Sequence, residues 1–137
     1  MFKEHFVYED YNGVKREEDH YFNLSQPEIV RLNFSSAGGL KETVTRLTQE
    51  QNGEKIIALF ERIIQMSIGR KSEDGRKFQK SPEIVEDFVS TPMYSMLYMH
   101  LATDADYAAK FINAIVPKDV AEAAKNQQNA ASIPFHN

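Results

Sequence analysis

The sequence predicts a mainly α-helical fold, in which a small N-terminal β-hairpin precedes a compact bundle of about six short helices. Strand-forming residues lie on either side of a turn at residues 10–13. After Asn23, apolar residues recur at the three- and four-residue spacing of amphipathic helices. Several of these segments begin with a typical helix N-cap residue followed by proline. These patterns predict one domain over residues 1–117, with the hairpin at 1–24 and the helices at 25–117.

Two registers are open to the hairpin. A two-residue Asn-Gly loop would scatter the aromatic side chains over both faces. A type I turn over residues 10–13, with Gly13 left-handed in a bulge, sets Glu9 opposite Lys15 on one face. It gathers the apolar side chains on the other face: Phe2, Phe6, Tyr8, Val14 and Phe22. Because a one-residue slip reverses every face, the pattern favours the bulged form, and its apolar face must pack on the helices or on another subunit.

The first helices are marked by caps and periodicity. Ser25-Gln26-Pro27-Glu28 is a capping box that opens a short helix, and residues 40–51 form a second one. Residues 54–68 give the clearest amphipathic pattern, with a polar stripe ~120° wide on a 100° wheel. The apolar arc that fills the rest of the wheel makes 54–68 the expected central helix.

The second half of the chain is expected to hold a loop and three capped helices. Residues 70–80 are expected to form the loop, and Ser81-Pro82-Glu83 then starts a helix. Thr91-Pro92 starts the next one, and Thr103 with Asp106 starts the third, which Pro117 ends. Residues 118–137 are expected to be a weakly helical to disordered C-terminal tail.

Composition excludes several function classes. The 16 Lys and Arg residues against 20 Asp and Glu residues give a net charge of −4, which argues against a general nucleic-acid binder. The chain has no cysteine, so it offers no disulfide, thiolate metal site or cysteine nucleophile. The charged N-terminus MFKEHFVYED is not typical of a signal or transit peptide, and no apolar run approaches the ~18 residues of a membrane span. We therefore expect a small soluble intracellular domain.

Catalytic and metal-binding patterns are also missing. The four histidines, at positions 5, 20, 100 and 136, have no partner at a metal-ligand spacing. His5 and His20 approach each other across the predicted hairpin, where they are interpreted as surface imidazoles. No serine lies in a G-x-S-x-G turn. We expect no enzyme, no metal and no cofactor.

A charged loop provides one alternative function. Residues 70–80 carry five basic and two acidic side chains with one aromatic residue. A small nucleic-acid-binding or regulatory adaptor would use this loop, through Arg70, Lys71, Arg76, Lys77 and Phe78. A short charged loop between helices is usually only solvated, so nucleic acid is the less favoured partner.

The segment Met93–Leu101 carries apolar side chains around almost the whole helix, including three of the five methionines. A helix of this kind is either buried on all sides or shared between a core and a partner. Methionine adapts to irregular partners, so the segment indicates a protein-binding groove. Its expected lining is Phe88, Met93, Tyr94, Met96, Leu97, Met99 and Phe111.

Two stretches of the chain carry a family resemblance. One is FVYEDYNG from Phe6, running on to YFNLS at residues 21–25. The other combines GRKSEDGRKF from Gly69, KSPE from Lys80, the Met/Tyr-rich helix and FINAIVP from Phe111. In this order they resemble the tail assembly chaperones of bacteriophages with long, non-contractile tails (siphophage type), over roughly residues 2–117.

The resemblance implies a role and partners. Such chaperones bind the helical, apolar tape measure protein in the host cytoplasm, keep it soluble and promote polymerisation of the tail tube. They are absent from the mature virion. Many are also made in a frameshift-extended form thought to recruit the major tail protein; this chain has the size of the short form. Many copies along one client suggest a homo-oligomer, for which the hairpin edge is available.

Overall fold

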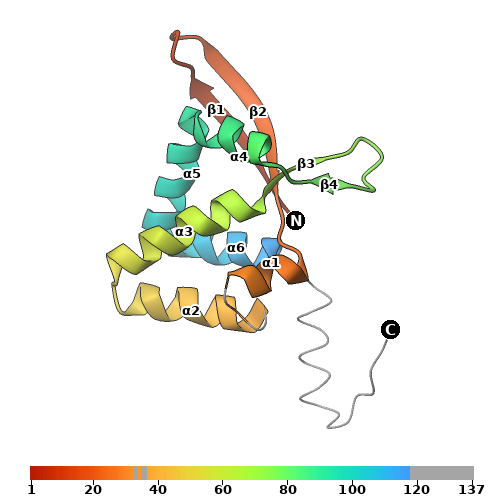
Figure 1. The fold of residues 1–137 in the computed structure, drawn as a ribbon. Coiled ribbons are helices and arrows are strands. Elements are labelled where there is room, and N and C mark those ends of the chain that lie inside the picture. The colour runs from red at the N-terminus through yellow and green to blue at the C-terminus, as the bar shows by residue number, and fades with distance from the viewer. Residues whose placement is uncertain (33, 35–36, 118–137) are drawn as a thin grey trace.

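Four strands and six helices form a mixed α/β fold in this computed structural model, which describes residues 1–32, 34 and 37–117 (Figure 1). The antiparallel sheet has the order β1-β2-β3-β4. Its strands are β1 (Phe2–Glu9), β2 (Lys15–Phe22), β3 (Ile68–Lys71) and β4 (Phe78–Gln79). The helices are α1 (Gln26–Arg31), α2 (Ala37–Gln49), α3 (Gly53–Ser67), α4 (Pro82–Val89), α5 (Pro92–Thr103) and α6 (Ala105–Ile115). The expected tail, residues 118–137, lies outside the described residues.

The prediction of a mainly α fold is correct for the N-terminal hairpin and the six helices, and it misses half of the sheet. Helices hold 57% of the described residues. Residues 70–80, expected as a loop, instead contribute to the β3–β4 hairpin. The structural cause is that α3 ends at Ser67 and Ile68 pairs with Phe22, which adds β3 to the edge of β2. A second antiparallel pairing then adds β4.

The bulged register of the β1–β2 hairpin is confirmed. Gly13 has φ +78°, its N–H donates to the Asp10 carbonyl at 2.9 Å, and Glu9 lies opposite Lys15. The expected apolar face is correct except at Val14, which is 55% exposed. Val14 stays in solvent because the tip of the hairpin projects beyond the helices (Figure 1).

Capping residues set the helix boundaries largely as expected. The Ser25 side chain accepts from the Glu28 backbone while the Glu28 side chain accepts from the Ser25 backbone, which confirms the capping box. The cap of α6 was predicted wrongly: Asp104, not Thr103, accepts from the Tyr107 N–H at 3.0 Å. Asp104 also closes α5, so one residue separates the two helices.

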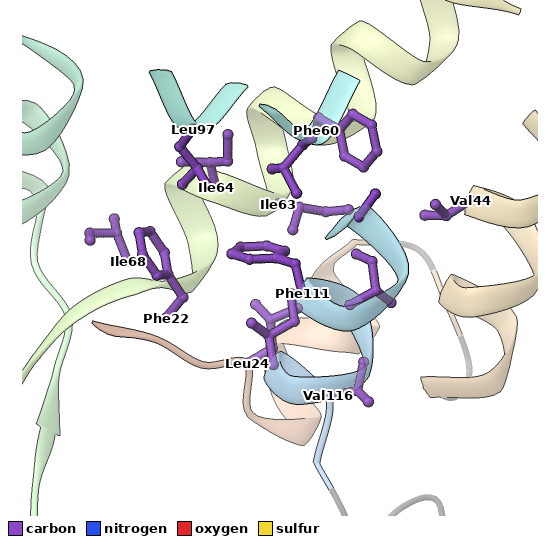
Figure 2. Packing of buried hydrophobic residues seen from close by; sticks show 14 of the residues in the cluster. Phe22, Leu24, Val44, Phe60, Ile63, Ile64, Ile68, Leu97, Phe111 and Val116 are labelled. Carbon is purple, nitrogen blue, oxygen red and sulfur yellow. The ribbon is translucent and has the colours of Figure 1, made fainter. Parts of the chain in front are cut away.

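The core lies between the inner face of the sheet and α3, α5 and α6 (Figure 2). Phe60, Ile63 and Ile64 of α3 are buried there, and the predicted polar stripe of this helix is exposed. Phe22 joins sheet to helices, because its ring packs 5.6 Å from Phe88 and 5.5 Å from Phe111. The sheet is therefore part of the core rather than an appendage of a helical bundle.

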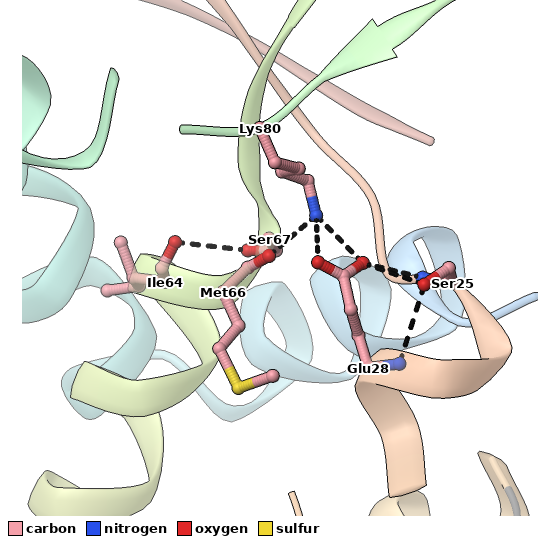
Figure 3. Close-up of polar contacts among 6 residues, drawn as sticks. All are labelled: Ser25, Glu28, Ile64, Met66, Ser67 and Lys80. Carbon is pink, nitrogen blue, oxygen red and sulfur yellow. Dashed lines mark hydrogen bonds and ion pairs between the residues drawn. The ribbon is translucent and has the colours of Figure 1, made fainter. Parts of the chain in front are cut away.

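A half-buried ion pair ties β4 to α1 and α3 (Figure 3). The Lys80 ammonium donates to both carboxylate oxygens of Glu28, at 2.8 and 2.7 Å, and to the Met66 carbonyl at 2.6 Å. Burial lowers the pKa of Lys80, and the bonds to Glu28 oppose that shift. Glu28 thus caps α1 and anchors the second hairpin at the same time.

Candidate functional site

Helix α5 divides into a buried side and an exposed side. Met93, Leu97 and Leu101, at four-residue spacing, are each at most 2% exposed. Met96 and Met99 lie outside the row formed by these three residues and are 42% and 54% exposed. The helix packs on α3, α4, α6 and β1, which together cover only the first side.

The seven residues expected to line a client groove are not brought together on one surface. Phe88, Met93, Leu97 and Phe111 belong to the core and are not accessible in this structure. Tyr94 is half-buried, with its ring 6.4 Å from that of Phe88. Met96 and Met99 alone of the seven are exposed. We call these two side chains the Met96–Met99 face.

A concave surface lies elsewhere, between α2 and α6, with a volume of about 390 Å³. Its buried floor is formed by Val44, Ala108 and Ile112, and Val44 points from α2 towards α6 (Figure 2). The walls carry small or neutral polar side chains and one amine: Lys41, Thr45, Thr48, Gln49, Ala105, Ala109 and Asn113. We call this surface the α2–α6 groove.

The α2–α6 groove exists because both helices present small side chains to it. Ala108 and Ala109 lie three and four residues after Ala105 along α6, and Thr48 lies three residues after Thr45 along α2. Side chains at this spacing share one helix face, so two such faces leave a channel between them. The sequence contains this spacing, but it does not show that the two helices face each other.

The chemistry of the α2–α6 groove suits binding rather than catalysis. Its floor is aliphatic, and hydroxyl and amide groups with Lys41 make up its polar part. A groove of this kind accepts an amphipathic helix that inserts apolar side chains at three-, four- and seven-residue spacing.

The basic residues of segment 70–80, which was expected to form a loop, lie on the exposed β3–β4 hairpin together with carboxylates. Ser72 Oγ and the Arg76 N–H both donate to Asp74, at 2.7 and 3.0 Å, and these bonds lower the pKa of Asp74. The Arg76 guanidinium lies 3.8 Å from the same carboxylate, and the Lys71 ammonium lies over the Tyr21 ring. Arg70 and Lys77 are exposed and Phe78 is half-buried. The cations do not form a single unopposed patch.

The hairpin histidines lie on opposite faces of the sheet. His5 is exposed and contacts Asp19 at 2.7 Å and Glu17 at 3.1 Å, and these two hydrogen bonds raise its pKa. His20 faces the helices, with its ring 5.1 Å from Phe88. Within the described part of the chain, no group of three or more histidine or acidic residues is placed to hold a metal ion. None of the described helices is long and apolar enough to cross a membrane.

One comparison with known proteins gives a match. A family model described as phage tail assembly chaperone matches residues 1–134. No curated protein and no solved structure matches the chain. The matched range takes in the whole sheet, all six helices and both surfaces described above.

Proposed function

The chain belongs to the phage tail assembly chaperone family, whose members are non-enzymatic chaperones, and from this premise we propose that it binds a tape measure protein. In the infected host cell it keeps that client soluble while the tail tube polymerises, and it is absent from the mature virion. The family match over residues 1–134 carries this proposal. The major tail protein is the second proposed partner, through a longer form of the chaperone.

The α2–α6 groove is the proposed docking site for the client. A tape measure protein, as the family resemblance implies, is long, helical and apolar, so it presents stripes of apolar side chains. The groove offers a buried aliphatic floor of Val44, Ala108 and Ile112 between two helices. Small side chains at a helix surface let a third helix approach closely, which favours contact along its whole length.

The Met96–Met99 face is the proposed second contact. Both methionines are exposed on one side of α5, where flexible thioether side chains adapt to varied apolar partners. It consists of two exposed side chains, so it adds contact area to a docked client. The other five residues expected at this site act through the core that supports α5.

The test is co-expression with the tape measure protein and measurement of its soluble fraction. Ala109→Glu and Thr45→Glu each place a carboxylate in the groove at an exposed position, so the fold is retained. Met99→Glu does the same on the Met96–Met99 face. Ala58→Glu, on the exposed polar stripe of α3, is the matched control.

We expect the groove variants to leave most of the client insoluble, Met99→Glu to have a smaller effect, and Ala58→Glu to have none. An unchanged soluble fraction in both groove variants would exclude the α2–α6 groove. A client that stays equally insoluble with and without the unmodified chaperone would contradict the proposed function itself.

The alternative of a nucleic-acid adaptor gains no support from the geometry of the β3–β4 hairpin. Its cations are interleaved with Glu73 and Asp74, and Arg76 is already close to a carboxylate. A phosphate backbone is bound by clustered cations without such competition. No second function is therefore proposed.

A further inference from the structure

The outer edge of β1 carries a self-complementary pattern. β1 is the first strand of the sheet order, so no strand of the described residues pairs with its outer side. It is eight residues long, and its outward side chains Lys3, His5, Val7 and Glu9 are all exposed. A long unpaired edge is a template for another strand unless it is covered or blocked.

The hydrogen-bonding phase of this edge follows from the β1–β2 ladder. The Asp10 N–H donates to the Val14 carbonyl at 2.8 Å, so the pair formed by Asp10 and Val14 is a hydrogen-bonded one. Such pairs recur at every second residue, so the even-numbered residues of β1 point their backbone groups at β2. The N–H and C=O groups of Lys3, His5, Val7 and Glu9 therefore point to the open side.

We propose that β1 pairs antiparallel with β1 of a second copy of this chain, about a two-fold axis at Phe6. In this register Lys3 lies opposite the partner's Glu9, and His5 lies opposite the partner's Val7. Each of these pairs joins residues whose backbone groups point outward, so the ladder is hydrogen-bonded at both. By the two-fold symmetry both pairs occur twice, and two ion pairs flank the ladder at its ends.

Neighbouring registers fit less well. Only shifts by two residues keep the outward-pointing groups in phase, because of the alternation along the ladder. A shift in one direction places His5 opposite the partner's His5 and leaves Glu9 without a counterpart. A shift in the other direction pairs Val7 with the partner's Val7 and leaves Lys3 without one. The register centred on Phe6 uses the whole strand and both opposite charges.

The consequence is one continuous sheet across two copies, with the helices of both on the same face. The two-fold axis stands perpendicular to the sheet, because Phe6 and the partner's Phe6 must point the same way. This arrangement removes the exposed edge of β1. It does not depend on the client, so it stands or falls separately from the proposed function.

Charge reversal tests the pairing in the full chain, by measuring the dimer dissociation constant in sedimentation equilibrium. We expect Lys3→Glu and Glu9→Lys each to weaken the dimer by roughly tenfold or more, because each replaces two attractive contacts by repulsive ones. The double variant, K3E with E9K, restores both contacts and should return the constant towards its original value. Lys77→Glu, the same charge reversal on the exposed β3–β4 hairpin at the far edge of the sheet from β1, is the matched control.

Cysteine cross-linking tests the register, since the chain has no cysteine of its own. K3C with E9C in one chain should give an oxidised covalent dimer, because residues opposite each other in a ladder lie within disulfide range. K3C alone should not, because the two copies of residue 3 are six positions apart along the ladder, roughly 20 Å.

A protein that stays monomeric at every attainable concentration would overturn the proposal. The proposal would also be overturned if the K3E/E9K double variant dimerised no more tightly than either single variant. It would be overturned as well if K3C alone formed the covalent dimer as readily as K3C with E9C. Circular dichroism of each variant verifies that the hairpin remains folded.

Discussion

The two hairpins of the sheet are stabilised by different interactions. β1–β2 places aromatic rings on one face, and Phe2 and Phe22 pack on Phe111 of α6 at 4.9 and 5.5 Å. β3–β4 has a short ladder and mostly charged residues; its two strands approach each other closely at Gly69, and it is attached through the pairing of Ile68 with Phe22 and the ion pair of Lys80. The first hairpin thus packs on the core along its length, whereas the second is held by one strand pairing and one ion pair.

The largest expected effect is the loss of the aromatic contact between β1–β2 and the helices. Phe22→Ala removes a fully buried ring that touches both Phe88 and Phe111. We expect the free energy of unfolding to fall by about 3–5 kcal/mol, measured by urea denaturation. Val14→Ala, at the exposed tip of the same hairpin, should change it by less than about 0.5 kcal/mol. An equal loss of unfolding free energy in the two variants would contradict the conclusion that only the inner face of this hairpin packs on the core.

A smaller effect is expected where β3 and β4 approach each other. A Cβ at position 69 would lie 2.5 Å from the Phe78 ring and 2.8 Å from the Gln79 carbonyl oxygen. Because a backbone atom cannot simply rotate away, Gly69→Ala should cost about 1–3 kcal/mol by overpacking.

Gly53→Ala is the matched control for Gly69→Ala, because nothing lies within 4 Å of the added methyl group there. It should leave the stability unchanged or raise it slightly, since alanine reduces the entropy of the unfolded chain. If Gly69→Ala were as harmless as Gly53→Ala, the close approach would not be a determinant of the second hairpin.

The contrast between the hairpins also explains what the sequence predicted. The alternation around Phe6 and Tyr8, with the Asp10–Gly13 turn, is local information and fixes both strands and their register. The pairing of Ile68 with Phe22 joins residues far apart in the chain, and Arg70 and Lys71 show no alternation. The second hairpin was therefore missed for a physical reason: its strands are defined by a neighbour and not by their own pattern.

The same distinction applies to the candidate binding surfaces. The sequence shows that α5 is apolar nearly all round, but not which side its neighbours cover. Met93 and Met96 are chemically alike, yet contacts with other elements bury the first and leave the second exposed. The α2–α6 groove forms where two helices that are far apart in the chain face each other with alanine and threonine side chains. The sequence pattern of either helix alone does not show that they meet.

The ion pair of the second hairpin should have an effect of about 1 kcal/mol. Lys80→Ala leaves the Glu28 carboxylate without its cation, although Ser25 still donates to it. Lys77→Ala removes an exposed lysine of the same hairpin and should have no measurable effect. Thermal unfolding of the two variants distinguishes the specific ion pair of Lys80 with Glu28 from a general effect of removing one positive charge from the hairpin. A loss in Lys77→Ala as large as that in Lys80→Ala would remove the anchoring role.

The smallest expected effect is a pH dependence confined to the first hairpin. Hydrogen bonds from His5 to Asp19 and Glu17 raise the pKa of His5 above its ordinary value of 6.5 and lower that of Asp19. Since folding favours the protonated imidazole, its contribution to stability is fully present below pH 6.5 and is lost as the pH rises through the folded pKa. An NMR titration of the His5 ring should give a midpoint above 6.5. Asp19→Asn should lower it, while Asp74→Asn in the second hairpin should leave it unchanged. If the His5 midpoint is the same in Asp19→Asn as in the unmodified protein, His5 and Asp19 do not interact in solution. A cross-strand ion pair between them must shift the titrations of both side chains.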